Sequence, residues 1–318
     1  MTRSNQFLTW LLAVILLFLS GCDAAELSTE TEELIPVIAE LPVEAEPQPY
    51  PVTVNDVRIK ASPKRVVSLS PSLTEILYEM GYGETLVGRG SYCDHPSEIS
   101  ALPDIGRPAK PDYDAILSLS PELLFTATAI PVKDQYRLEE GGVRVVYLPY
   151  PRSVEEFEKI YRAVGLIYEG LFEGEEKGSE CFSALRALFE GSDRFSLGSF
   201  LYITEGLSVA TGDTFESSVL SRFGTNVAAE GENYDFPKET LSELQPDMIL
   251  LNSSYTVDDL LSDEVYASLE AVQNGRVYPI DNTYFERPSA RLGELIRRLG
   301  EALGEAEEAE RAGESSAE

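Results

Sequence analysis

The chain has 318 residues, of which 43% are hydrophobic, so it is long enough for one or two domains with a sizeable core. Its 55 acidic and 25 basic residues give a formal net charge of -30, which disfavours nucleic acid and anionic lipid heads as partners. Three cysteines cannot build a disulfide framework, and a single histidine excludes a site with several histidine ligands.

The N-terminal segment has the pattern of an export signal. Arg3 precedes an apolar run from Phe7 to Leu19. A membrane-spanning helix needs about 20 residues, so this shorter run is more typical of a signal peptide. It ends in Leu19-Ser-Gly-Cys22, which resembles a bacterial lipobox. We predict a lipoprotein signal peptide over residues 1–22 and a lipid on Cys22, which would anchor the exported chain to the cell membrane. The alternative is an ordinary signal peptide with a chance cysteine.

Two acidic segments flank the expected folded part. Between Asp23 and Tyr50 the sequence holds acidic residues and prolines but no lysine or arginine. This composition predicts an extended, self-repelling tether over residues 23–57. The acidic stretch 305–318 is predicted to be a solvated helix end and tail. The folded domain is therefore expected over residues 58–304.

The first expected elements form a strand–turn–helix unit. Arg65–Ser70 is a short apolar run rich in β-branched residues, which predicts a buried strand ending at Pro71. Ser72 and Glu75 have the spacing of a capping box, which would open a helix through Met80. In α/β proteins the N-terminus of such a helix faces the ligand at the sheet edge.

Two phrases recur in the two halves of the chain. A helix end, a proline and a strand follow one another at 116–126 and again at 241–251. A glycine followed by a strand comes next in both halves, at 142–149 and at 275–280. The repeated order predicts two similar α/β lobes, an N-lobe of about 58–150 and a C-lobe of about 197–304. The alternative is that any α/β chain repeats such phrases.

The segment between the halves favours a long helix. Apolar residues at Phe157, Ile160 and Val164 follow helical spacing, and Glu, Ala, Leu and Lys are abundant. We predict a linker helix over about 153–190, with a break near Gly170 to Gly178. The predicted fold class is α/β: two similar α/β lobes joined by a long rigid helix, with a ligand cleft between the lobes and small ligand-driven motion.

Five phrases in order resemble the iron/cobalamin class (class III, helix-linked) of periplasmic binding proteins. They are Arg65–Glu75 (RVVSLSPSLTE), Tyr92–Pro96 (YCDHP), Leu102–Gly106 (LPDIG), Ile116–Glu122 (ILSLSPE) and Phe285–Leu292 (FERPSARL). The resemblance covers about 58–304. It implies a substrate-binding component of an ABC importer, which is not an enzyme, has no cofactor or metal of its own, and works as a monomer with a permease and its ATPase.

The ligand implied by the resemblance is cobalamin or a related corrinoid, because the Tyr92–Pro96 phrase and the Tyr284–Arg287 ending are most similar to cobalamin-binding members. A ferric siderophore or haem is the alternative. A corrinoid needs aromatic walls for its faces and hydrogen-bonding groups for its amide edges. The resemblance places Tyr92 on one lobe, and Tyr284, Phe285 and Arg287 on the other, as ligand contacts. Arg287 could instead form a structural salt bridge.

Four further residues are candidates for ligand binding. Tyr234 and Phe236 lie in a loop that could cover the ligand, or they could pack beneath it. Ser70 flanks the proline turn and could offer a donor to the ligand edge. Arg107 stands where haem binders of the class often carry a tyrosine, which argues against haem, although another tyrosine or His95 could substitute. An arginine there could instead favour an anionic siderophore.

The resemblance also implies docking residues on each lobe. Asp114 and Glu239 match the carboxylates that pair with arginines of the permease, a contact that sets orientation and association rate. They could instead be ordinary acids at helix starts. Cys93 and Cys181 are expected to be free thiols, although an oxidising compartment would allow them to pair.

Two other protein classes compete with a receptor. An exported enzyme is disfavoured because one histidine excludes most catalytic triads and zinc sites. A surface adhesion or scaffold protein would not be stabilised by a small molecule.

Overall fold

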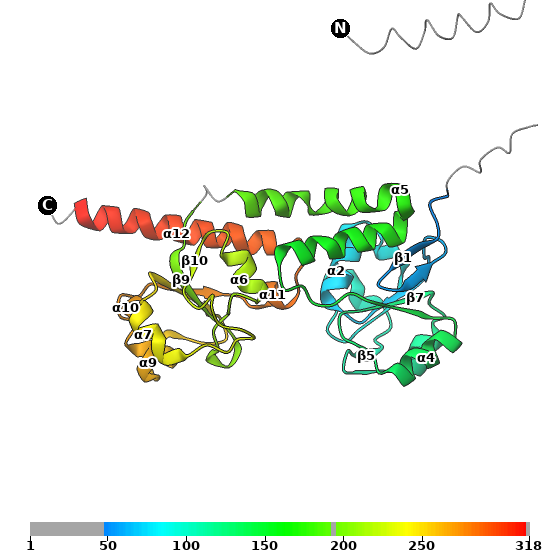
Figure 1. Cartoon of the computed structure of the whole chain (residues 1–318), viewed down its shortest axis with the longest axis horizontal. Coiled ribbons are helices and arrows are strands. Elements are labelled where there is room, and N and C mark those ends of the chain that lie inside the picture. The colour runs from blue at the N-terminus through cyan, green and yellow to red at the C-terminus, as the bar shows by residue number, and fades with distance from the viewer. Residues whose placement is uncertain (1–47, 192–194, 316–318) are drawn as a thin grey trace, which may run out of the picture. The chain divides into compact units, whose positions relative to one another are not determined.

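The computed structural model describes residues 48–191 and 195–315, with side chains described as far as residue 304. The residues from Pro47 to Glu318 form one compact unit. Figure 1 shows that this unit consists of two α/β lobes connected by helix α5. The predicted signal peptide and Cys22 lie outside the described residues.

The N-lobe contains a four-stranded parallel sheet in the order β4-β3-β7-β8. Its strands are β3 (Val66–Ser68), β4 (Leu86–Arg89), β7 (Leu123–Thr126) and β8 (Arg144–Tyr147). Its helices are α2 (Pro71–Glu79), η1 (Gly83–Thr85), η2 (Ser97–Ala101), α3 (Tyr113–Ser118) and α4 (Val132–Glu140), and a short hairpin is formed by β5 (Gly106–Arg107) and β6 (Lys110–Pro111). Every residue of β3 and β7 is buried, as expected for parallel strands covered on both faces.

The C-lobe repeats this arrangement with a parallel sheet in the order β10-β9-β11-β12. Its strands are β9 (Gly198–Ile203), β10 (Gly224–Asn226), β11 (Met248–Asn252) and β12 (Val277–Ile280). Its helices are η3 (Glu205–Leu207), α6 (Phe215–Leu220), η4 (Lys238–Thr240), α7 (Leu241–Leu244), α8 (Val257–Leu261), α9 (Glu264–Ala267), α10 (Glu270–Gln273), α11 (Thr283–Glu286) and α12 (Leu292–Ser315). In each lobe the strands lie in the order second, first, third, fourth, so the prediction of two similar lobes is confirmed.

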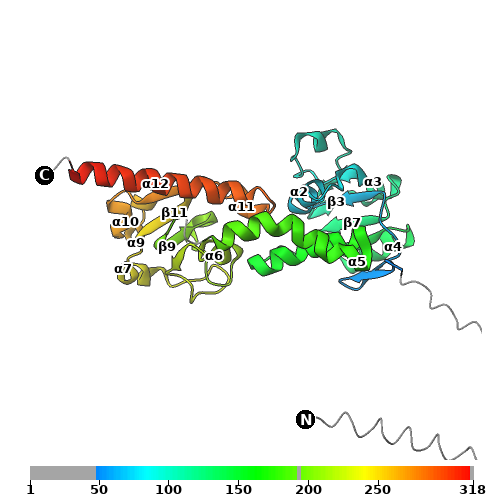
Figure 2. The same ribbon diagram turned by 90° about the horizontal axis from the view of Figure 1, so that it is seen from above.

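Helix α5 (Val154–Glu190) links the lobes, as predicted. Its N-terminus is capped by Ser153, whose side chain accepts a hydrogen bond from the backbone N–H of Glu156. It is interrupted at Gly170, whose φ of 77° is not helical. The two halves run antiparallel (Figures 1 and 2), in close contact at glycines. A Cβ atom at Gly174 would lie 2.4 Å from Cα of Leu166, so only glycine allows this approach.

A second connection joins the lobes through α2. Ser72 Oγ donates to the backbone oxygen of Pro288 at 2.5 Å, and Ser289 Oγ donates to Glu75 Oε2 at 2.7 Å. Arg291 pairs with Glu75 Oε1 at 3.1 Å. The prediction of a capping box is therefore wrong: Ser70 caps α2, while Ser72 and Glu75 bind the segment that leads into α12. Both lobes are held at α5 and at this junction, which limits hinge motion.

Two predicted boundaries differ from the structure. The hairpin of β1 (Val52–Val54) and β2 (Val57–Ile59) lies largely within the expected tether, and its buried valines join the core. Tyr50 OH donates to the backbone oxygen of Ile167, so the folded part begins before residue 58. At the other end, α12 continues to Ser315, into the expected tail.

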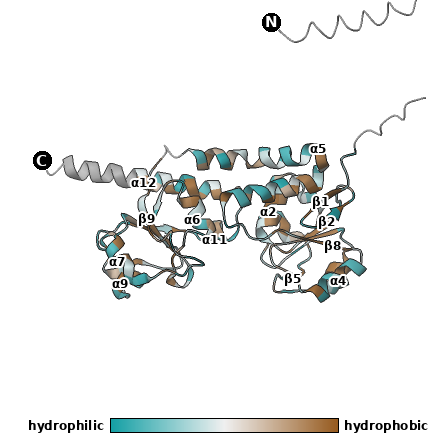
Figure 3. Ribbon diagram, viewed as in Figure 1, coloured by the Kyte–Doolittle hydropathy of each residue, from teal (hydrophilic) through white to brown (hydrophobic). Residues whose placement is uncertain are grey.

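Hydropathy follows this architecture, with apolar residues concentrated in the strands and on the inner faces of the helices (Figure 3). Cys93 is a buried free thiol and Cys181 a partly buried one. None of the described helices has the length and apolar character needed to span a membrane.

Candidate ligand-binding cleft

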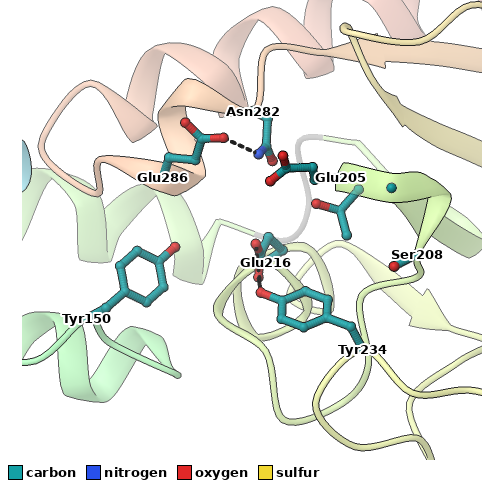
Figure 4. A pocket seen from close by; sticks show the side chains of 9 residues that line it. Tyr150, Glu205, Ser208, Glu216, Tyr234, Asn282 and Glu286 are labelled. Atoms are coloured by element: carbon teal, nitrogen blue, oxygen red, sulfur yellow. Dashed lines mark hydrogen bonds between the residues drawn. The ribbon is translucent and has the colours of Figure 1, made fainter. Parts of the chain in front are cut away.

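The C-lobe contributes most of a cavity of about 610 Å³. Its lining residues come from α6, η3, α11 and the loops between them, and one residue, Tyr150, comes from the N-lobe side. The lining residues are Tyr150, Thr204, Glu205, Gly206, Ser208, Glu216, Tyr234, Asn282 and Glu286. Figure 4 shows these side chains converging from both sides of the cavity. The lining combines two phenol rings, three carboxylates and one amide, and thus offers aromatic surface together with many hydrogen-bond acceptors.

A second cavity of about 200 Å³ lies against the N-lobe. It is lined mainly by the start of α2, including Ser70, and by the prolines around Tyr150. Tyr150 and Glu286 line both cavities, so one residue from each side marks where the two meet. We call the two cavities together the cleft. It lies between the lobes, at the carboxyl ends of parallel strands, where ligands bind in open α/β sheets.

Tyr150 follows strand β8 and is held by contacts with the C-lobe. Its hydroxyl group donates to the backbone oxygen of Phe285, and its ring meets Phe215 edge-on with a centroid distance of 5.8 Å. Burial of the hydroxyl, with a smaller contribution from the charge of Glu216, raises the pKa of Tyr150. The phenol therefore stays neutral, and its ring offers a fixed apolar face to the cleft.

Glu216 and Tyr234 form a hydrogen-bonded pair within the cleft. Glu216 lies in the first turn of α6, and its residue surface is only 5% exposed. The Tyr234 hydroxyl lies 3.2 Å from each carboxylate oxygen of Glu216. Burial raises the pKa of Glu216, while the hydrogen bonds from its own backbone and from Tyr234 oppose this rise.

Asn282, directly before α11, is hydrogen-bonded to Glu286 at the end of α11, on the opposite wall of the cavity (Figure 4). Asn282 Nδ2 donates to Glu286 Oε1 at 2.8 Å, and Tyr202 OH donates to Asn282 Oδ1 at 2.5 Å. Tyr202 thereby fixes the orientation of the amide. The second oxygen of the Glu286 carboxylate is left to accept a hydrogen bond from a ligand.

The structure brings Ser70 and Tyr234 to the cleft lining but places three other predicted residues differently. Tyr92 is 47% exposed on the N-lobe, and the guanidinium carbon of Arg107 lies 5.7 Å from its ring centroid. Arg287 forms an ion pair with Asp94 across the lobes, with an N–O distance of 2.5 Å. This ion pair is the structural salt bridge that the sequence analysis gives as the alternative role of Arg287.

The predicted aromatic contacts on the C-lobe need correction. Phe285 is fully buried and Tyr284 is 6% exposed, and both rings belong to the hydrophobic core. The short helix α11 turns these apolar rings inward, where Phe285 lies 5.5 Å from Tyr202 between ring centroids. The polar residues Asn282, directly before α11, and Glu286 line the cleft instead. Phe236 is partly buried against the C-lobe core, which corresponds to the packing alternative.

The two predicted docking residues lie on the surface of separate lobes. Asp114 is in the first turn of α3, with a side chain that is 83% exposed and paired with Arg137. Glu239 is exposed in η4, just before α7. The structure places both at helix starts, as the sequence implied.

Sequence reasoning missed most of the polar lining, notably Tyr150, Glu205, Glu216, Asn282 and Glu286. A signal for two of them was present. Tyr150 comes three residues after the end of β8, and Asn282 comes two residues after the end of β12, the last parallel strand of each lobe. Side chains at such strand ends are the ones that reach a ligand in α/β sheets.

Residues 66–284 match the model of a family described as periplasmic binding protein. The chain belongs to this family. Among curated relatives, the uncharacterized ABC transporter substrate-binding lipoprotein YvrC of Bacillus subtilis is 26% identical over 278 residues, which is 80% of this chain and 86% of the relative. The vitamin B12-binding protein of Vibrio campbellii is 22% identical over 245 residues, which is 75% of this chain and 88% of the relative.

Solved structures of this family share the fold. The periplasmic vitamin B12 binding protein BtuF of Vibrio cholerae has a TM-score of 0.61 at 21% identity, covering 77% of this chain and 98% of its own. The periplasmic heme binding protein HutB of Vibrio cholerae has a TM-score of 0.64 at 20% identity, covering 75% of this chain and 98% of its own. The two-lobed, helix-linked architecture predicted from the sequence is that of the family.

Proposed function

We propose that this protein is the substrate-binding component of an ABC importer, anchored to the cell membrane by a lipid on Cys22, and that its ligand is cobalamin or a related corrinoid. The observation that carries the proposal is the cleft between two lobes of a periplasmic binding fold, lined by phenol rings and hydrogen-bond acceptors. The lipoprotein relative and the vitamin B12-binding relative support the anchor and the ligand, respectively.

The chemistry of the cleft fits a corrinoid. Such a ligand is a large ring with apolar faces and an edge of amide groups. Tyr150 and Tyr234 supply aromatic surface for the faces. Glu205, Glu286 and Asn282 supply acceptors for amide N–H groups at the edge. In this proposal the receptor captures the ligand without chemical change.

A ferric siderophore or haem is the second candidate, favoured by the similarity of the fold to a heme binding protein. Haem carries two propionates, and many siderophores are anionic. The three carboxylates of the cleft, Glu205, Glu216 and Glu286, would repel such groups. The lining therefore fits an amide-edged ligand better.

Delivery would use one carboxylate on each lobe. We propose that Asp114 and Glu239 contact arginines of the permease, where they set the orientation of the loaded receptor. Both lobes would then dock at once, as a monomer, and ATP hydrolysis by the importer would drive ligand release.

An uptake assay tests the transport role. Cells that lack this protein are expected to lose high-affinity uptake of radiolabelled cyanocobalamin, and the wild-type chain is expected to restore it. A chain with Asp114→Arg and Glu239→Arg should restore less than a tenth of that uptake while binding cyanocobalamin normally. A matched control is Glu173→Arg with Glu180→Arg, because both acids are exposed on α5 and line neither cavity of the cleft. Full uptake with the docking variant would refute the docking role, and full uptake without the protein would refute the transport role.

A further inference from the structure

Three carboxylates enter the cleft from three different elements. Glu205 belongs to η3, Glu216 to α6 and Glu286 to α11, and all three line the larger cavity. Figure 4 shows them around the same space, next to the rings of Tyr150 and Tyr234. Neither cavity has a lysine or arginine among its lining residues. The charged groups that face a ligand in the described cleft are thus all acidic.

Two arginines that are neighbours of lining residues in the sequence form ion pairs with other acids. Arg287, directly after Glu286, pairs with Asp94. Arg152, two residues after Tyr150, pairs with Asp213 and donates to the Asn233 side chain at 3.4 Å. Neither arginine is among the residues that line the two cavities.

The three carboxylates differ in how many hydrogen bonds they already accept from the protein. Glu216 accepts from Tyr234 OH, and Glu286 Oε1 accepts from Asn282 Nδ2. Among the described residues, no hydrogen-bond partner is found for the Glu205 carboxylate. An ionised carboxylate can accept about four hydrogen bonds, so Glu205 and Glu286 retain acceptor positions on the cavity side.

We propose that Glu205, Glu216 and Glu286 are specificity-determining residues that select a corrinoid whose edge is fully amidated and reject one whose edge carries carboxylates. This inference rests on the proposed function, since it concerns the ligand class of the same cleft. Amide N–H groups are donors that match the free carboxylate positions. Ligand carboxylates would bring like charges together in a partly enclosed space, where water screens them less than in bulk solution.

Two corrinoids with the same ring and the same axial ligands test the inference. Dicyanocobinamide carries only amide side chains, whereas dicyanocobyrinic acid carries carboxylates in their place. The wild-type protein is expected to bind dicyanocobinamide at least tenfold more tightly by calorimetric titration at constant ionic strength. Glu205→Gln and Glu286→Gln keep the shape of the side chain while removing its charge, and each should reduce the ratio of the two affinities at least threefold.

The overall charge of -30 also disfavours an anionic ligand, and a control variant separates this effect from that of the cleft. Glu264→Gln removes one charge on α9, outside the cleft, and should leave the ratio unchanged. Equal affinities in the wild type, or a ratio that the two cleft variants do not change, would overturn the inference while leaving corrinoid binding intact. If the folded protein binds neither corrinoid, the proposed function and the inference both fail.

Discussion

At the scale of single residues, Tyr150 is the side chain whose loss should weaken ligand binding in the cleft most. Its ring lines both cavities, and its hydroxyl group holds the backbone of Phe285 across the lobes. Tyr150→Ala should therefore raise the Kd for cyanocobalamin at least tenfold, or about 1.4 kcal/mol. Tyr150→Phe keeps the ring face and should raise it less than threefold. Calorimetric titration measures both values.

The matched control for this prediction is Tyr136→Ala. Tyr136 is 64% exposed on α4 and lines neither cavity, so its loss should leave the Kd unchanged. Similar losses for the alanine variants at positions 150 and 136 would show that the effect is not local to the cleft. An unchanged Kd for Tyr150→Ala would place the ligand elsewhere.

The orientations and partners of single side chains are also the features that the sequence predicts least well. Tyr284 and Phe285 stand in the phrase that resembles the family's cleft motif, but only the turn of α11 decides which of its side chains face inward. A four-residue helix gives no clear periodicity, so the burial of Phe285 could not be read from the sequence. Ser72 and Glu75 have the spacing of a capping box, but their actual partners lie more than 200 residues away. Such long-range pairing leaves no local signal.

At the scale of elements, the two antiparallel halves of α5 pack closely against each other. Glycines at 165, 174 and 178 allow the two backbones to approach within van der Waals contact. A methyl group at Gly174 would meet Cα of Leu166 at 2.4 Å and the backbone oxygen of Gly165 at 2.8 Å. Gly174→Ala should therefore lower the free energy of unfolding by about 1–3 kcal/mol, as expected for overpacking.

Gly304 in α12 provides the comparison, because a Cβ atom there would meet nothing within 4 Å. Gly304→Ala should leave the free energy of unfolding unchanged or raise it by up to about 1 kcal/mol, since alanine favours the helix more than glycine does. Urea denaturation followed by circular dichroism measures both variants. Equal stability of the two variants would contradict the close packing inside α5.

The sequence predicts the helices and strands better than it predicts the contacts of single side chains. The buried strands at Val66–Ser68 and Leu123–Thr126 were predicted because parallel strands read as short apolar runs. The glycines between Gly170 and Gly178 predict a break in the linker helix, and the structure has it at Gly170. The β1–β2 hairpin was missed because it follows directly after a long acidic, proline-rich stretch and has only three residues in each strand.

At the scale of the whole molecule, the lobes are held by α5 and by the contacts of α2 with the segment before α12. The Tyr150–Phe285 hydrogen bond and the Arg287–Asp94 ion pair add to these connections. Glu75 is buried at this second connection and is bound by Ser289 and Arg291. A receptor whose lobes are held at several places presents a cleft that is largely formed before the ligand arrives. Pre-organisation of this kind reduces the entropy lost on binding.

The most direct test is calorimetric titration of cyanocobalamin into the chain that begins at residue 23, which carries no lipid and contains the compact unit Pro47–Glu318. We expect one-to-one binding in the nanomolar to low-micromolar range, together with a rise in the thermal unfolding temperature. Absence of both heat and thermal shift, from protein shown by circular dichroism to be folded, would contradict corrinoid binding. Binding of haemin or a ferric siderophore in the same assay would then assign the cleft to the second candidate.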